Sequence, residues 1–230
     1  MSFILISASL KAEEFFLESE ETQTQLIELY TSEGCSSCPP ADRWLSSLKS
    51  HSGLFKAFIP VAFHVGYWDY IGWKDELAIK GNEARQRRHH KKGNFSAVYT
   101  PGVVNAGKEW RRWHVKQPQV SSKNVGKLTL NLNNQELTAA FDGKKGWLIL
   151  NVALMGMDIE TQVRAGENHG KTLKHDFVAL KHLTFVSSDN SWDVKLSQDF
   201  LQSKHKNVGL VAWIEEQNNP TPIQAVGTLL

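Results

Sequence analysis

The chain has 230 residues, of which 41% are hydrophobic and 22% charged, a composition ordinary for a soluble globular protein with a sizeable buried core. Its formal net charge is only +2, so no strong overall field draws the molecule to nucleic acid or to an anionic membrane. After the N-terminus, no apolar stretch approaches the roughly 20 residues of a spanning helix. We therefore expect no nucleic-acid partner and no integral membrane segment in the mature chain.

Residues 1–23 form a candidate leader segment. Phe3–Leu10 is a short apolar run that ends in small residues, with Ser7 and Ser9 spaced as in a cleavage site. No Lys or Arg precedes the run, and a first strand or a frayed end fits it equally well. We expect a periplasmic or secreted protein, with a cytoplasmic location as the alternative.

Strands and helices alternate from residue 24 to about residue 120. Buried strands are expected where apolar residues run together, and helices where apolar residues recur at helical spacing. The expected elements are a strand at 26–31, a helix after residue 38, a strand at 58–65, a helix from about 75 to 93 and a strand at 103–105. This alternation predicts a βαβ unit and a parallel sheet.

The pattern changes between residues 117 and 125. "KLTLNLNN" and "ELTAAFDG" alternate apolar and polar residues around a turn, which indicates a hairpin. Further short strands follow, and helical spacing is suggested only near Leu196–Leu201. We therefore predict an α/β domain at 24–120 followed by an all-β sandwich domain at 121–230.

Cys35 and Cys38, the only cysteines, allow three interpretations. A structural disulfide across so short a loop would stabilise the fold little. A zinc site needs about four ligands, but the chain has no second cysteine pair, and His51 and His64 lie far apart in sequence. A redox-active dithiol is favoured because the pair lies where a buried strand leads into a helix.

The position of Cys35 just ahead of this helix suggests an activated thiol. The backbone N–H groups of Ser36, Ser37 and Cys38 would face its sulfur, and with the helix dipole they would lower the pKa of an exposed thiol. Cys38, on the helix and less exposed, would be the resolving thiol.

Thr100-Pro101 directly precedes the third strand of the same sheet. A cis proline there would expose backbone edges with which an extended peptide or a thiol adduct could pair. The alternative is an ordinary trans turn proline.

These segments carry a family resemblance. "LYTSEGCSSC" followed by "YTPGVVNAG" resembles the glutaredoxin and thioredoxin superfamily. Together with "HVGYWDYIGWKD", "ARQRR" and "GENHG", they are similar to the domain of unknown function 1223 family of bacteria and plants, from about Leu26 to the C-terminus. The resemblance implies a secreted protein whose 24–120 domain is thioredoxin-like. It also implies that Cys35 attacks, Cys38 resolves and a cis Thr100-Pro101 peptide faces the substrate.

By the same resemblance, Glu28 is a candidate proton relay. It lies in an otherwise apolar strand, where a buried carboxylate would have a raised pKa and could accept a proton from the second cysteine. The alternative is a carboxylate on an edge strand or facing solvent.

An aromatic loop follows the second strand, and in a parallel sheet it would border the cysteines. It contains Tyr67, Trp68, Tyr70 and Trp73, and we assign Trp68 and Trp73 to substrate binding. The alternative is that these rings cover the interface between the two domains. His64, before the loop, either tunes Cys35 or is a core histidine, and the core role is favoured.

Two further motifs favour structural interpretations. "ARQRRHHKK", residues 84–92, is expected to be the solvated basic end of a helix rather than a nucleic-acid site. "GENHG", residues 166–170, contains Glu167, Asn168 and His169 as candidate ligands, but Asn and Gly are what turns require.

The sequence thus predicts thiol–disulfide exchange through Cys35 and Cys38 with a protein or small-molecule disulfide or thiol as substrate. No cofactor or metal is required, and glutathione or a partner oxidoreductase would recycle the pair. One alternative is a Cu(I)-binding metallochaperone that uses both thiolates, with His64 as a third ligand. Another is a binding protein that has lost turnover.

Overall fold

Three β-sheets dominate residues 14–230, which this computed structural model describes. Strands account for 42% of these residues and helices for 14%. The strands are β1 (Phe15–Glu18), β2 (Gln25–Thr31), β3 (Phe58–His64), β4 (Gly102–Asn105), β5 (Lys108–Glu109), β6 (Leu128–Asn133), β7 (Glu136–Phe141), β8 (Leu148–Gly156), β9 (Ile159–Gln162), β10 (Thr172–His175), β11 (Val178–Ser187), β12 (Ser191–Lys195), β13 (Val208–Glu216) and β14 (Asn219–Leu229). The helices are α1 (Pro39–Ser47), α2 (Lys80–Lys91) and α3 (Gln198–Leu201), with 3-10 turns η1 (Leu48–Ser50) and η2 (Asp69–Ile71).

The largest sheet joins strands from both halves of the chain in the order β14-β13-β8-β11-β3-β2-β4-β5. β2 and β3 pair in parallel, which confirms the predicted βαβ unit around α1. β4, however, runs antiparallel to β2, with Gly102 opposite Tyr30. The free edge of β3 pairs with β11, where Val178 lies opposite Ala62. One continuous sheet therefore carries both the cysteine region and the C-terminal strands.

The predicted fold class, an α/β thioredoxin-like domain followed by a separate β-sandwich domain, is wrong. The protein is mostly β, and the eight-stranded sheet crosses the expected boundary at residues 117–125. The boundary itself lies in a segment of turns and extended chain between β5 and β6. Local periodicity identified β2 and β3 correctly, but it could not show that the open edge of β3 is completed by β11.

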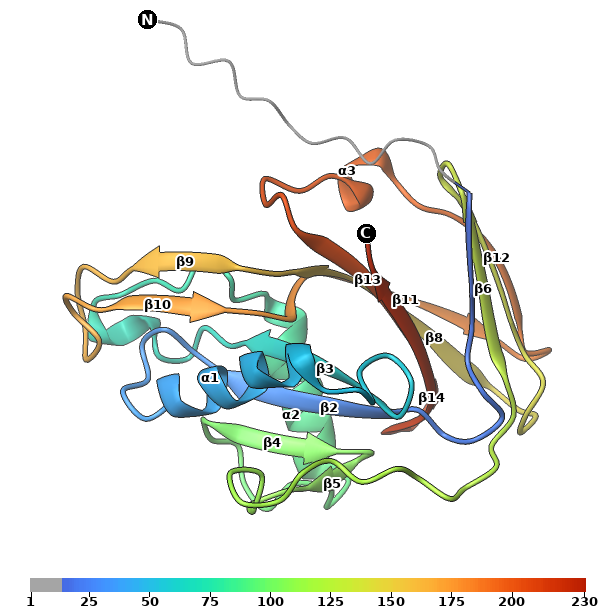
Figure 1. Ribbon diagram of the computed structural model, residues 1–230, viewed down its shortest axis with the longest axis horizontal. Coiled ribbons are helices and arrows are strands. Elements are labelled where there is room, and N and C mark those ends of the chain that lie inside the picture. The colour runs from blue at the N-terminus through green and yellow to red at the C-terminus, as the bar shows by residue number, and fades with distance from the viewer. Residues whose placement is uncertain (1–13) are drawn as a thin grey trace, which may run out of the picture.

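The second sheet, of order β1-β6-β7-β12, packs face to face against the C-terminal part of the large sheet. Figure 1 shows β6 and β12 at one side of the molecule, facing β8, β11 and β13. Alternating residues of both sheets fill the core between them, including Leu130, Trp192, Leu154 and Leu210. The hairpin predicted from "KLTLNLNN" and "ELTAAFDG" is β6–β7.

Period-two alternation in β2 decides which face each helix covers. Ile27 and Leu29 belong to the core under α1, whereas Leu26 and Tyr30 belong to the core on the other face, where α2 lies. Figure 1 accordingly shows α1 in front of β2 and β3, and α2 behind them. Glu28 shares the even-numbered face with Tyr30, which directs its side chain away from α1.

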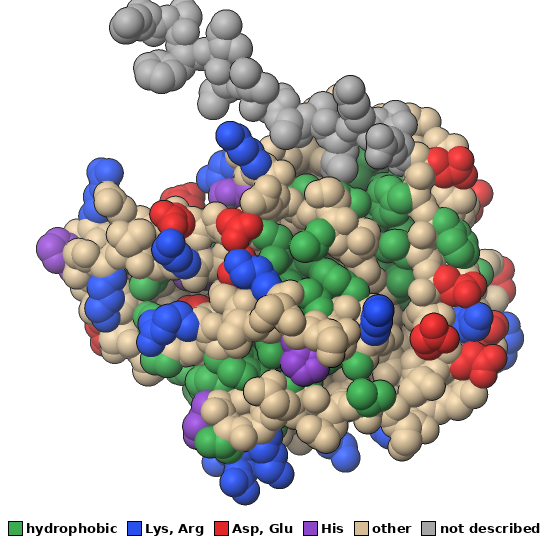
Figure 2. Space-filling model, in the orientation of Figure 1, with side chains coloured by type: hydrophobic (Ala, Val, Ile, Leu, Met, Phe, Trp, Pro, Cys, Tyr) green, Lys and Arg blue, Asp and Glu red, His purple; other side chains and the backbone are tan. Residues whose placement is uncertain are grey.

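The third sheet is the hairpin β9–β10, which projects from the end of the large sheet and reaches α1 (Figure 1). On the face shown in Figure 2, acidic and basic side chains are interspersed over this hairpin and over the four-stranded sheet, with a hydrophobic patch between the two regions. This mixed pattern agrees with the small net charge of the chain.

The candidate leader segment is only partly described. Phe3–Leu10 lies outside the described residues, whereas β1, also within residues 1–23, pairs antiparallel with β6. None of the helices within residues 14–230 combines the length and the apolar character that crossing a membrane requires.

Candidate functional site: the Cys35–Cys38 disulfide

Cys35 and Cys38 form a disulfide at the start of α1. β2 ends at Thr31, and Ser32–Cys38, here named the cysteine loop, leads into the helix. Cys38 is the residue before the first helical turn, and Pro39 and Pro40 occupy the first two helical positions, where no intrahelical N–H is needed. The sequence therefore placed the cysteine pair correctly at a strand-to-helix junction.

The expectation of an exposed Cys35 sulfur is wrong for this disulfide state. Cys35 is 1% exposed and Cys38 is fully buried. Ser36 and Ser37, between them, are exposed, and the Ser37 hydroxyl lies 3.3 Å from Cys35 Sγ. The disulfide is thus buried, but the exposed Ser37 side chain lies directly against it.

Trp68 covers one side of the cysteine loop. A Cβ atom at Gly34 would lie 2.9 Å from Trp68 Cβ, so glycine permits this close approach. The Trp68 indole donates a 2.8 Å hydrogen bond to Thr100 Oγ1, and the Thr100-Pro101 peptide is cis, as predicted. The structure therefore brings together the cysteine loop, Trp68 and Thr100-Pro101.

Trp73 contacts a different part of the same loop. Its indole donates a 2.8 Å hydrogen bond to Glu33 Oε2, and its Cβ lies close to Gly166. Both tryptophans are half-buried, so each offers only part of its ring surface to another molecule. Through these contacts, Trp68 and Trp73 pack against the cysteine loop on two sides.

The "GENHG" turn between β9 and β10 covers the loop from another direction. Asn168 is fully buried and donates hydrogen bonds to the carbonyl oxygens of Glu33 (2.8 Å) and Cys35 (2.9 Å). Glu167 Oε2 accepts a 3.1 Å hydrogen bond from the Ser36 N–H. The motif therefore stabilises a turn, as predicted, but the turn it stabilises is the cysteine loop more than 130 residues earlier.

The backbone donors expected to stabilise a Cys35 thiolate are partly occupied. The Ser36 N–H binds Glu167, and the Cys38 N–H donates to the Cys35 carbonyl at 3.2 Å. A carboxylate thus already occupies one of the anion-stabilising donors at the start of α1.

Beneath the loop lies an acid–histidine cluster that the sequence did not predict as a unit. It comprises Glu33, Asp42, His64, Asp75 and His175, each at most 6% exposed. Asp75 Oδ2 accepts from the Glu33 N–H at 2.9 Å and lies 2.8 Å from His64 Nδ1. The His64 and His175 rings meet edge to face, and His175 Nε2 lies 3.3 Å from Glu33 Oε1.

The charges in this cluster are distributed by burial and by pairing. Burial opposes the charge on His64, but Asp75 outweighs it and raises the pKa of His64. The same ion pair outweighs burial at Asp75 and lowers its pKa. Asp42 has no such close partner, so burial raises its pKa. His64 is therefore a core histidine held by Asp75, as favoured, and Asp42 is the acid with increased proton affinity.

Asp42 lies one helical turn after Cys38. Its backbone N–H donates a 3.1 Å hydrogen bond to the Cys38 carbonyl, and its Oδ1 accepts from the Thr31 hydroxyl at 2.8 Å. Residues four apart share one face of a helix, so the Asp42 carboxyl and the Cys38 side chain belong to the same face of α1.

Glu28 is not placed to relay protons for Cys38. It is fully buried, but on the sheet face opposite α1, where Arg85 Nε and Nη2 bind its two carboxylate oxygens at 2.7 and 3.0 Å. Burial alone would raise the pKa of Glu28, but Arg85 and His89 hold it well below its usual range. The predicted raised pKa is therefore wrong.

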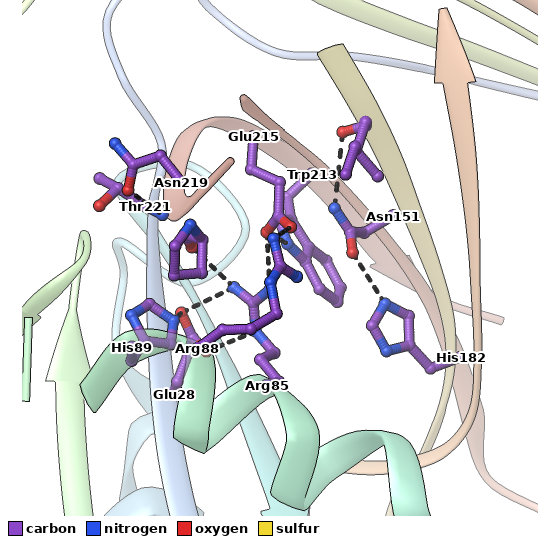
Figure 3. Close-up of polar contacts among 12 residues, drawn as sticks. Glu28, Arg85, Arg88, His89, Asn151, His182, Trp213, Glu215, Asn219 and Thr221 are labelled. Atoms are coloured by element: carbon purple, nitrogen blue, oxygen red, sulfur yellow. Dashed lines mark hydrogen bonds and ion pairs between the residues drawn. The ribbon is translucent and has the colours of Figure 1, made fainter. Parts of the chain in front are cut away.

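The same contacts correct the interpretation of residues 84–92 as a solvated helix end. Arg85 is 2% exposed and His89 is fully buried, because both face Glu28. Arg85 Nη1 also binds Glu215 at 2.6 Å, and Arg88 binds the other oxygen of Glu215 at 2.8 Å. Figure 3 shows this ion-pair network between α2, β2 and β13.

Metal binding gains no support from the geometry. Within residues 14–230, no three His, Cys, Asp or Glu side chains are placed to hold a metal ion. His64, the proposed third Cu(I) ligand, is instead paired with Asp75 through Nδ1.

Fold and site together define a mostly β protein with a Cys-x-x-Cys disulfide at the start of a helix, in a loop that Trp68 connects to the cis Thr100-Pro101 segment. The chain belongs to the family described as Protein of unknown function (DUF1223), which matches residues 26–215. The family resemblance found in the sequence is confirmed, whereas no finding assigns the chain to the glutaredoxin and thioredoxin superfamily.

Two solved structures share the fold. Protein AGR_C_4864 from Agrobacterium tumefaciens is 21% identical with a TM-score of 0.66, over 92% of this chain and 96% of that one. HBP35 of Porphyromonas gingivalis is 11% identical with a TM-score of 0.55, over 91% of this chain and 76% of that one. No curated protein matches the chain.

Proposed function

We propose that the protein is a thiol–disulfide oxidoreductase whose reactive group is the Cys35–Cys38 pair. The observation that carries this proposal is the position of the disulfide at the start of α1, one serine side chain below the surface. The positive end of the helix dipole stabilises a thiolate at such a position, and a stabilised thiolate is a good leaving group in exchange.

In the reducing direction, the Cys35 thiolate attacks one sulfur of a substrate disulfide. A mixed disulfide forms and the other substrate sulfur leaves as a thiolate. The Cys38 thiol then loses its proton and attacks Cys35 Sγ, which releases the second substrate sulfur and closes the Cys35–Cys38 disulfide. Two electrons pass to the substrate, and glutathione or a partner oxidoreductase returns the pair to the dithiol. The oxidising direction is the reverse.

Asp42 replaces Glu28 as the proposed proton acceptor for Cys38. Burial increases the proton affinity of Asp42, and its backbone is bonded to that of Cys38 within the first turns of α1. A carboxylate with increased proton affinity can accept the Cys38 proton as the second attack begins.

Substrate is proposed to approach beside Thr100-Pro101 and Trp68. Three contacts support this side: Trp68 packs on Gly34, its indole binds Thr100, and β4 pairs with β2 directly before the cysteine loop. The backbone around Pro101 would pair with an extended protein substrate, and Trp68 would contact its apolar side chains.

A periplasmic or secreted location, proposed from Phe3–Leu10, would suit a pair that is found oxidised. The burial of both cysteines, however, favours a second candidate function. In that case the protein is a non-catalytic binding protein, and the disulfide only fixes the cysteine loop.

The reduction potential separates these candidates. The full chain is equilibrated in glutathione redox buffers, quenched with an alkylating agent and weighed by mass spectrometry. An oxidoreductase is expected to show one two-electron transition between about −270 and −120 mV, as exchange proteins do. A potential below about −300 mV, typical of structural disulfides, would instead establish the non-catalytic candidate. Cys35→Ser, which cannot form the disulfide, is the control.

A further inference from the structure

The turn between β9 and β10, residues 163–171, is here named the clasp. Its ends are closed by backbone hydrogen bonds between Val163 and Lys171 (2.9 Å) and between Gly170 and Val163 (2.9 Å). Asn168 anchors it: the buried amide donates to the cysteine loop, and its Oδ1 accepts from Lys171 Nζ at 2.9 Å. The clasp is thus a preformed turn with one buried attachment to the cysteine loop.

Its second attachment is different in kind. Glu167 and Ser36 are both exposed, and the Ser36 N–H donates a hydrogen bond to Glu167 Oε2. The Ser36 side chain and the Ser36 backbone N–H together lower the pKa of Glu167, so the side chain is a carboxylate at neutral pH. Two other charged side chains of this region have different partners. Lys171 binds Asn168, and Glu33 contacts Trp73 and His175. Glu167 is therefore the charged side chain bound to the Ser36 N–H.

We propose that the clasp regulates access to Cys35, with Glu167 as a latch that releases when the disulfide is reduced. This inference rests on the proposed exchange function. In the disulfide, Cys35 Sγ is uncharged and the Ser36 N–H is available to Glu167. After reduction, a Cys35 thiolate lies on the residue preceding this N–H, and two anions compete for one donor. Their repulsion weakens the latch and uncovers the sulfur that must meet a substrate.

The test compares Glu167→Gln with the unmodified chain. Glutamine keeps the size of the side chain and its acceptor oxygen but removes the charge. Each protein is fully reduced with a phosphine, and the rate of alkylation at Cys35 is followed against pH by peptide mass mapping. We expect the pKa of the Cys35 thiol to fall, because its thiolate no longer faces a second anion. On the high-pH plateau, where the thiol is fully ionised, we expect alkylation to be about two- to five-fold slower than in the unmodified chain, because the uncharged latch stays closed.

Glu160→Gln is the matched control, because Glu160 lies on β9 of the same hairpin and pairs with Lys174. It should alkylate like the unmodified chain. An equal or faster plateau rate in Glu167→Gln, or an equal slowing in Glu160→Gln, would overturn the latch. Because alkylation of the reduced thiol needs no substrate disulfide, this result is readable even if the reduction potential rules out the exchange function.

Discussion

Replacement of Arg85 by methionine is expected to lower the free energy of unfolding by about 3–5 kcal/mol. The guanidinium is buried and binds two carboxylates, Glu28 and Glu215, which have no exposed surface of their own. Methionine fills similar space but leaves Glu28 without its main counter-charge and Glu215 dependent on Arg88 alone. Denaturant unfolding followed by circular dichroism measures the change.

Arg88→Met is the matched control for Arg85. The Arg88 side chain is 38% exposed and Glu215 keeps Arg85 when it is removed, so we expect a loss of about 1 kcal/mol or less. Similar losses in the two variants would contradict a network centred on Arg85.

The effect of Arg85→Met should also depend on pH. The pKa values of Glu28 and Glu215 are lowered in the folded protein, so their ion pairs stabilise it above the unfolded carboxyl pKa of about 4.3. This stabilisation is lost as the pH falls. The difference between Arg85→Met and the unmodified chain should therefore narrow in acid, whereas a pH-independent difference would indicate a packing defect alone.

Trp192→Ala is expected to destabilise the protein by about 3–5 kcal/mol, because it opens a cavity between the two large sheets. Trp192 is 5% exposed, and its indole donates a 2.9 Å hydrogen bond to the Phe185 carbonyl across that core. Since the eight-stranded sheet lines this core and also holds β2, unfolding should occur in one transition that includes the cysteine region.

Trp192→Phe is the control that keeps an aromatic ring in this core, and it should lose clearly less stability. Within each variant, circular dichroism and alkylation of the cysteines in reduced protein should give the same unfolding midpoint. Two separate unfolding transitions, with the four-stranded sheet unfolding by itself, would contradict the shared core and show that the two halves of the chain are independent domains.

The local elements of the cysteine region could be predicted because their sequence signals are local. β2 and β3 are apolar runs, and the prolines after Cys38 mark the start of α1. α2 begins at Lys80 rather than near Asp75, because residues 76–77 form a turn in which the Leu77 N–H donates to Asp75 Oδ1, and Ile79 is extended. What no local signal supplied was the partner of the open edge of β3, which is β11.

The site shows the same limit. The cysteine pair, Trp68 and the cis Thr100-Pro101 peptide lie together as expected, because short connections join them to one sheet. Glu167 and Asn168 come from more than 130 residues away, and nothing in "GENHG" names the loop that it binds. The side on which Glu28 lies could have been predicted from the sequence. Alternation in β2 places Glu28 on the face opposite the α1-facing residues Ile27 and Leu29, and therefore away from Cys38.

The most direct measurement of the central claim is a trapping experiment with the full-length Cys38→Ser variant. It is reduced, mixed with oxidised glutathione, and its adducts are mapped by mass spectrometry. A reactive Cys35 without its resolving thiol should accumulate one glutathione adduct at residue 35, while the parallel Cys35→Ser variant leaves the buried Cys38 unmodified. Absence of the adduct at residue 35, or equally fast modification of Cys38, would show that Cys35 is not the attacking sulfur.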